Sequence, residues 1–327
     1  MPLRVISCTI AVMRAKQNTA VRGCIFAGVT SACLIAVAPG CGVRATCPGE
    51  TAEQVTVVLT FDDGPLAADL LIDGADSTAL LRPLASILET LERRGARGVF
   101  FIEGPGGDVD GVRVVDDFAE GLRVIHDGGH VLGYHAFRHD PALWSQTLGF
   151  PLLGRAQMQS DLDRLVAYLD TALGMIGTNR DDWFTPIFRQ PFGGSGLSRT
   201  EAQIAAQQRG WIYRGFVIDS VDWTDNIEAD PGLAMGLPFE TETERIDFVR
   251  ERIRSGIYRN WDRDVIDILL HVNTFTSDHL DIWIDEIETA YAQRVGATIV
   301  FDVPDCYVTT PDATVDRSIV EAVVREW

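Results

Sequence analysis

The sequence predicts an α/β protein in which parallel β-strands alternate with α-helices. Strand-like apolar runs and amphipathic, helix-like segments follow one another along most of the 327 residues. The composition, 46% hydrophobic and 23% charged, is that of a globular protein with one large domain or two small ones. No glycine-rich fingerprint opens the first helix, so a dinucleotide-binding fold has no support. A barrel and an open doubly wound sheet remain as alternatives.

The expected strands are runs of apolar residues that end in polar or turn-forming ones. They are VTVVLTF (55–61), GVFFIEG (98–104), HVLGYH (130–135), FTPIFRQP (184–191), IYRGFVIDS (212–220), VIDILLHV (265–272) and TIVFDV (298–303). The expected helices carry apolar residues at helical spacing, and several end at a glycine. They cover residues 79–95, 115–129, 156–173, 198–210, 242–256 and 279–296. In a barrel of parallel strands, the chemistry is expected where the strands end.

The beginning of the chain has the pattern of an export signal. Residues 1–22 carry four basic side chains and no acidic one, and an uncharged apolar stretch follows. We therefore expect a signal peptide at 1–40, a linker at 41–54 and the functional domain at 55–327. Cys41, in the sequence APGC, is a candidate for lipid attachment, and an uncleaved anchor is the alternative, since about 20 apolar residues can span a bilayer. The expected location is periplasmic, membrane-tethered or secreted.

Charge and residue usage exclude several classes of protein. The formal net charge of −19 argues against nucleic acid as a partner, because phosphates favour clustered lysine and arginine. Lys16 is the only lysine, so a mature chain without it cannot be a P-loop NTPase, a Schiff-base enzyme or a PLP enzyme. Four of the six cysteines lie in the leader or at its edge. The other two, Cys47 and Cys306, could pair in an oxidising compartment.

Unusual polar residues occur at the strand ends. The stretch LTFDDGPL places Asp62 and Asp63 directly after the first strand. Neighbours in a strand point to opposite faces, so the two carboxylates could have different environments and tasks. The alternative is an ordinary turn, in which Asp and Gly are common. Later strand ends add His135, His139, Arg189, Asp219, Asp222, Trp223 and His271.

The spacing of His135 and His139 suits one divalent ion, since residues four apart on a helical turn share a face. With one aspartate they would leave open positions for water and substrate, as in a catalytic metal site. The other aspartate could then act as a base on that water. Ala136 excludes the H-E-x-x-H motif of metalloproteases. His126 and His130 have the same spacing, but glycines separate them, so that pair is predicted to be structural.

Five segments, TFDDGP, HAFRH, RQPFGG, DSVDW and LLH, resemble in order and character the five motifs of the polysaccharide deacetylases, the NodB-type carbohydrate esterases. The resemblance runs from about Val55 to Val303. It implies a distorted (β/α)7 barrel and a metal-dependent hydrolase that removes N- or O-acetyl groups from a glycan. Peptidoglycan, chitin-like oligomers and other cell-surface polysaccharides all fit this substrate class. A monomer is expected.

By position, the resemblance also implies a metal site with a base beside it. Asp63, His135 and His139 would hold the metal, most commonly zinc. Asp62 would be the general base, and Arg189 would pair with it and orient it.

The remaining motifs imply the acid and the pocket. His271 would be the general acid, with its ring fixed by Asp219. The backbone N–H of Phe192 would bind the oxyanion, and Trp223 and Leu269 would line the pocket for the acetyl methyl group.

Two departures from the family pattern bear on this reading. Ala136 stands where the family usually has Ser or Thr, whose hydroxyl steadies the histidine loop. Segments 140–185 and 224–262 look long, and such loops set specificity. One alternative is a carbohydrate-binding module without turnover, which should have lost the base, the acid or a ligand. Another is a related barrel acting on cyclic amides or imides, against which the exported leader argues.

Overall fold

A computed structural model of the chain describes residues 54–67, 77–105, 112–144, 154–193, 196–223, 239, 241–293 and 297–310. Every described residue belongs to the second of the two units into which the chain divides, Val43–Trp327. The expected signal peptide lies outside the described residues. None of the described helices is both long and apolar enough to cross a membrane.

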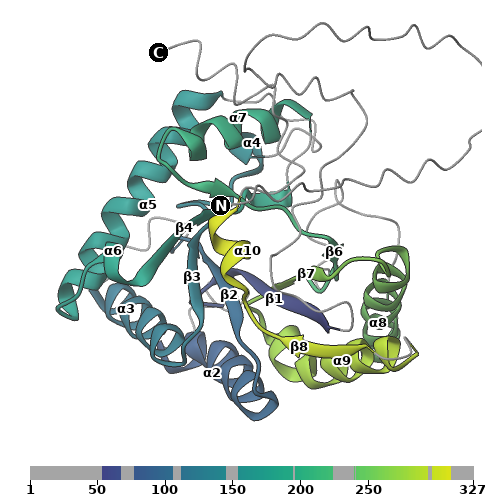
Figure 1. Ribbon diagram of the computed structural model, residues 1–327. Coiled ribbons are helices and arrows are strands. Elements are labelled where there is room, and N and C mark those ends of the chain that lie inside the picture. Colours follow the sequence, from purple (N-terminus) through teal and green to yellow (C-terminus); the bar gives the residue numbers. More distant parts are fainter. Residues whose placement is uncertain are drawn as a thin grey trace, which may run out of the picture. The chain divides into compact units, whose positions relative to one another are not determined.

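Parallel strands form one curled sheet in the middle of the second unit (Figure 1). Seven strands follow the order β5–β4–β3–β2–β1–β7–β6, and β8 pairs with the first residues of β1. The strands are β1 (Gln54–Gly64), β2 (Gly98–Ile102), β3 (Val131–Tyr134), β4 (Phe184–Phe188), β5 (Ile212–Tyr213), β6 (Ile218–Asp219), β7 (Val265–His271) and β8 (Thr298–Phe301). The predicted α/β class and distorted barrel are confirmed, as a curled sheet in which β5 and β6 are not paired with each other among the described residues.

The longer helices surround the strands on the outside of the sheet (Figure 1). The longer ones are α2 (Ser77–Arg94), α3 (Val112–Asp127), α5 (Arg155–Met175), α7 (Gly196–Gln207), α8 (Glu242–Arg259) and α9 (Thr274–Ala292). The short ones are α4 (Pro141–Trp144), α6 (Arg180–Trp183), the 3₁₀ helix η1 (Pro191–Gly193) and α10 (Asp305–Thr309). Side-chain caps fix where two of them begin: Thr241 accepts from the Glu244 N–H before α8, and Asn273 accepts from the Thr276 N–H before α9.

Two apolar cores follow from the alternation of side chains along the strands. The larger lies between the sheet and the outer helices. The smaller fills the inside of the curled sheet with Val58, Val99, Phe101 and Ile187, and it also receives Val303 and Tyr307 from the segment that ends in α10. Polar side chains occupy the same inner face nearer the strand ends, where the predicted site residues lie.

The strand expected at 212–220 is two short strands. The Arg214 N–H donates to the Phe188 carbonyl of β4, whereas the Val217 N–H donates to the Asp267 carbonyl of β7. The two halves therefore pair with different neighbours, and residues 214–217 connect them. The Gly215 carbonyl accepts a hydrogen bond from Arg189 Nη2 at 2.7 Å, so this connection contacts a buried guanidinium.

Candidate active site

The predicted base and acid stand on neighbouring strands. In the β1–β7 ladder Asp62 and His271 are Cα partners, at the carboxyl ends of both strands. Residues paired in this way on parallel strands present their side chains to the same face. Asp62 is buried, and the His271 side chain is 12% exposed.

Asp222, and not Asp219, holds the ring of His271. His271 Nδ1 lies 2.7 Å from Asp222 Oδ1, and the His271 backbone N–H donates to Oδ2 at 2.8 Å. Burial alone would lower the pKa of His271, but Asp222 raises it to about 10. The ring is therefore held as a proton donor whose Nε2 remains available. The predicted contact between Asp219 and His271 is wrong, because the two aspartates of DSVDW point in different directions.

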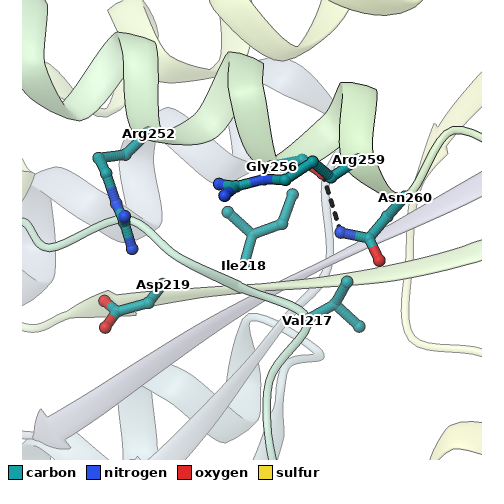
Figure 2. A pocket seen from close by; sticks show the side chains of 7 residues that line it. All are labelled: Val217, Ile218, Asp219, Arg252, Gly256, Arg259 and Asn260. Carbon is teal, nitrogen blue, oxygen red and sulfur yellow. Dashed lines mark hydrogen bonds between the residues drawn. The ribbon is translucent and has the colours of Figure 1, made fainter.

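Asp219 instead supports the turn that presents Asp222. Its Oδ1 accepts the Val221 N–H at 2.9 Å. Val221 has a φ of 61°, a conformation that is unfavourable for a β-branched residue. Asp219 also borders a cavity of about 120 Å³ between β6 and α8, into which Arg252 extends from α8 (Figure 2).

Arg189 lies against Asp62, as the resemblance implied. Nη1 of Arg189 donates to Asp62 Oδ1 at 3.1 Å and to Thr60 Oγ1 at 2.5 Å, and all three side chains are buried. A carboxylate that accepts from a guanidinium is fixed in orientation by that charge-assisted hydrogen bond.

Asp63 does not follow the alternation of a regular strand. Its φ is 65°, and the β1–β2 register is irregular between Phe61 and Gly64. Consequently both carboxylates face His135: its Nε2 lies 4.0 Å from Asp62 Oδ2 and 3.3 Å from Asp63 Oδ1. The two aspartates share one site while differing in partners, with Asp62 on the arginine side and Asp63 on the histidine side.

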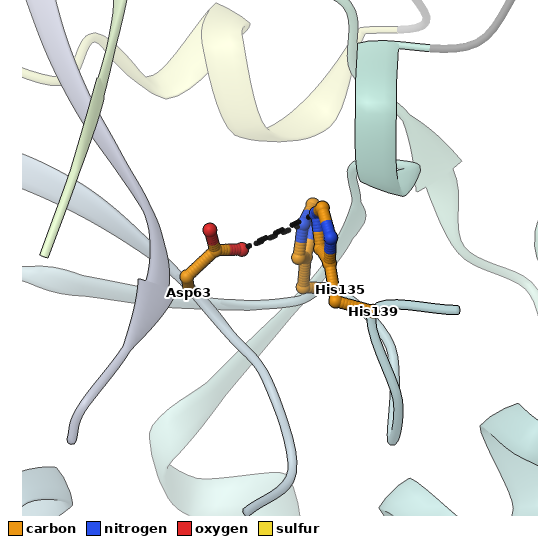
Figure 3. Close-up of side chains that lie close together, drawn as sticks. All are labelled: Asp63, His135 and His139. Atoms are coloured by element: carbon orange, nitrogen blue, oxygen red, sulfur yellow. Dashed lines mark ion pairs between the residues drawn. The ribbon is translucent and has the colours of Figure 1, made fainter. Parts of the chain in front are cut away.

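Asp63, His135 and His139 form a group that could hold a metal ion, the one such group among the described residues (Figure 3). Asp63 Oδ1 lies 3.3 Å from His135 Nε2 and 3.7 Å from His139 Nε2. Asp63 Oδ1 and His135 Nε2 are buried without a hydrogen-bond partner, which is costly unless a cation lies between them. Ligands of a tetrahedral zinc ion lie about 3.3–3.6 Å apart at the usual bond lengths. The residues therefore fit a divalent metal.

The surroundings of the histidines suit metal ligands. Nδ1 of His135 lies 2.7 Å from the Arg189 carbonyl oxygen, a contact that requires the proton on Nδ1 and so makes Nε2 the nitrogen that can bind a metal. Burial lowers the pKa of His139 to about 4, against the attraction of Asp63. Burial acts to raise the pKa of Asp63, but the surrounding histidines hold it below its usual value. These are the protonation states that metal binding requires.

The remaining predicted residues line the same region. Phe192, in η1, is half-buried, has a φ of 59° and packs against His139, with ring centroids 4.0 Å apart and the ring planes tilted by 53°. Leu269 is buried on β7, two residues before His271, and Trp223 follows Asp222 and is half-buried. Their proposed tasks, oxyanion binding and the acetyl pocket, stay predictions. The three non-glycine residues with positive φ in the described chain, Asp63, Phe192 and Val221, all belong to these motifs. Backbone strain of this kind concentrates at functional sites.

Comparison with known proteins identifies the family. Residues 49–208 match the sequence model of the polysaccharide deacetylases. A Bacillus subtilis protein named as a polysaccharide deacetylase, YheN, is 27% identical over 169 residues, 51% of this chain. Over residues 49–208, just under half of the chain, the sequence matches the polysaccharide deacetylase family. The match spans less than half, 46%, of the B. subtilis relative.

A solved structure has a similar fold. The chitin deacetylase of the fungal pathogen Colletotrichum lindemuthianum has a TM-score of 0.51 and 16% identity, over 80% of this chain and 92% of that one. A family 4 pseudoenzyme from Bacillus anthracis has a TM-score of 0.48 and 17% identity, over 77% of this chain and 65% of that one.

Sequence reasoning missed a carboxylate that supports the histidine loop of this deacetylase domain. Asp161, on α5, is buried, and its Oδ2 accepts the backbone N–H groups of Phe137 at 2.8 Å and Arg138 at 3.4 Å. The pattern gave a weak signal, an acid among buried positions of a helix. His126 and His130 lie elsewhere, as expected: His126 stacks on Trp183, and His130 Nδ1 accepts the Gly98 N–H.

Proposed function

We propose that this chain is a metal-dependent deacetylase that hydrolyses N- or O-acetyl groups on a glycan. The proposal rests on three groups of side chains that lie together at the carboxyl ends of the strands. These are a group of three metal ligands, a carboxylate fixed by an arginine, and a histidine charged by an aspartate.

Each residue has a defined task in this hydrolysis. A divalent ion held by Asp63, His135 and His139, most commonly zinc in such sites, would polarise the acetyl carbonyl and make a water molecule more acidic. Asp62 accepts a proton from the attacking water, whose oxygen bonds to the carbonyl carbon. His271 gives its proton to the departing sugar nitrogen or oxygen as the bond to the acetyl group breaks. Acetate and a free amine or hydroxyl are the products.

The substrate class follows from the family. The Colletotrichum protein is a chitin deacetylase. Peptidoglycan carries N-acetyl amides as chitin does, whereas acetylated xylan carries O-acetyl esters. The competing proposal is a carbohydrate-binding module without turnover, since the family includes a protein described as a pseudoenzyme. The base, the acid and all three ligands are present in this chain, which favours turnover.

Acetate release across a panel of acetylated glycans tests the proposal. The panel contains peptidoglycan, chitin oligomers and acetylated xylan, each assayed before and after treatment with a chelator and after zinc is restored. We expect release from at least one glycan, loss of release with the chelator, and recovery with zinc. Binding without release on every glycan would support the module and refute the enzyme. Release that survives complete metal removal would refute the metal dependence.

We also propose that the protein is exported and acts as a monomer. The basic, acid-free start and the apolar stretch after it support the export proposal. Cys41 supplies a thiol for lipid attachment if the leader is cleaved before it. Mass spectrometry of the native protein should find a new N-terminus at or near Cys41, with or without a lipid. A soluble cytoplasmic protein that keeps residues 1–40 would refute export.

A further inference from the structure

Asp267 is a buried carboxylate on the inner face of β7 that belongs to none of the five motifs. Residues two apart in a strand share a face, so Asp267 lies in line with Leu269 and His271 and deeper in the curled sheet. Asp267 is 6% exposed. Burying a charge at such a depth costs free energy unless the charge is paired and hydrogen-bonded, so Asp267 requires partners.

The main partner is Arg189, the residue that holds the proposed base. Nη2 of Arg189 donates to Asp267 Oδ1 at 3.1 Å and Oδ2 at 3.0 Å, while Nη1 donates to Asp62 Oδ1 at 3.1 Å. The guanidinium thus lies between two carboxylates. Arg189 contacts both oxygens of Asp267 but only one oxygen of Asp62, so Asp267 makes the more extensive contact with the guanidinium.

Asp267 is itself fixed from below. The hydroxyl of Tyr307, on α10, donates to Asp267 Oδ2, and the Tyr307 ring packs inside the curled sheet against the inner core. Thr60 Oγ1 lies 3.3 Å from Asp267 Oδ1. Tyr307 and Thr60 therefore hold the Asp267 carboxylate in place independently of Arg189.

We propose that Asp267, braced by Tyr307, is a positioning residue for the proposed deacetylation. It fixes the Arg189 guanidinium so that Nη1 keeps Asp62 aimed at the water. The inference rests on the proposed function for its kinetic consequence, and on the contacts above for its structural one. Asp267 contacts none of the three metal ligands through its side chain, so metal binding should be independent of its charge.

The test compares three variants. Asp267→Asn keeps the size of the side chain and removes its charge; we expect kcat to fall about 10–100-fold, as for other residues that orient a catalytic group, with KM and metal content unchanged. Tyr307→Phe keeps every charge and removes one hydrogen bond; we expect a smaller fall in kcat with the same KM. The matched control is Glu286→Gln, since Glu286 is a buried carboxylate paired with two arginines of α8. It should lower the unfolding midpoint without changing kcat.

Each result either supports or overturns the role of Asp267. An unchanged kcat in Asp267→Asn, or a fall equal to that of Glu286→Gln, overturns the inference. If Asp267→Asn does not fold, Tyr307→Phe decides, and its unchanged kcat overturns the inference. If the wild-type protein releases no acetate, the proposed function fails, and crystal structures of wild type and Asp267→Asn decide instead. A guanidinium that leaves Asp62 supports the inference, and one that stays refutes it.

Discussion

At the scale of single residues, Asp62 and Asp63 are adjacent in sequence but have different partners. Asp63→Asn replaces an anionic ligand by a neutral one, so we expect metal content to fall. Asp62→Asn leaves the metal group intact but cannot accept a proton, so we expect metal content to remain while kcat falls by about 10²–10⁴-fold. Elemental analysis beside acetate release measures both.

The two variants serve as controls for each other. If Asp62→Asn loses its metal while Asp63→Asn keeps it, the division of tasks is reversed. If both keep full activity, the pair is only a turn and the proposed function falls.

The His271–Asp222 pair makes the stability of the metal-free protein depend on pH. The pKa of His271 is raised to about 10 in the folded state, against about 6.5 in an unfolded chain. Its contribution is therefore fully present below about pH 6.5 and is lost as the pH rises toward 10. We expect the free energy of unfolding to decrease by up to about 1.4 kcal/mol per pH unit in that window.

Urea unfolding of the metal-free protein across this pH window measures the effect. Asp222→Asn removes the partner that raises the pKa, so its stability should change less with pH than that of the wild type. Equal slopes for the two proteins would contradict the assignment of Asp222 as the partner.

At the scale of elements, α5 supports the loop between β3 and α4 that carries both histidines. Asp161 accepts two backbone N–H groups of that loop and so anchors it, a task that the sequence resemblance implied for a hydroxyl at position 136. An amide at position 161 has one oxygen, so it cannot serve both the backbone and the Arg138 guanidinium. We expect Asp161→Asn to weaken zinc affinity about 10–100-fold.

Titration with zinc measures this effect without any assay of activity. Asp163→Asn is the matched control, because Asp163 lies on the same helix but its side chain is 74% exposed. Ala136→Ser in the Asp161→Asn background should recover part of the affinity. Equal affinities for Asp161→Asn and Asp163→Asn would show that α5 does not hold the loop.

The same elements show what sequence could predict. Periodicity located the main strands and helices, because strand and helix repeats follow from burial on one face. It did not predict that Asp222, and not Asp219, binds His271. The left-handed turn at Val221 breaks the strand alternation, and a β-branched residue does not predict a positive φ. Nor did periodicity divide the strand expected at 212–220. There the Gly215 carbonyl accepts a hydrogen bond from Arg189, which follows a different strand.

The support behind the site was the least predictable part. Asp161 and Asp267 act through contacts between residues far apart in sequence, which no local pattern encodes. A weak signal was nevertheless present for Asp267, because an acid within the apolar strand VIDILLH must be paired if that strand is buried.

At the scale of the whole molecule, Cys306 is the one cysteine among the described residues. Cys306 is disulfide-bonded, and all other cysteines lie outside the described residues, at or before position 47. Disulfides persist in oxidising compartments, so this bond supports the proposed export. Removal of a leader ending at residue 40 would leave Cys41 and Cys47 as partners. A lipid on Cys41 would leave only Cys47.

We therefore predict a bond between Cys47 and Cys306. Closing a loop of this length contributes about 5–6 kcal/mol to stability in the chain-entropy model, since the cross-link restricts the unfolded ensemble. Cys306→Ser should accordingly lower the denaturant midpoint with kcat measured at low temperature preserved, and Cys47→Ser should lower it equally. Peptide mapping without reduction should recover a linked peptide containing both cysteines. A linked peptide that joins Cys306 to Cys41 would assign the bond elsewhere and exclude lipid attachment at that thiol, and a Cys306 thiol that titrates as free would refute the bond altogether.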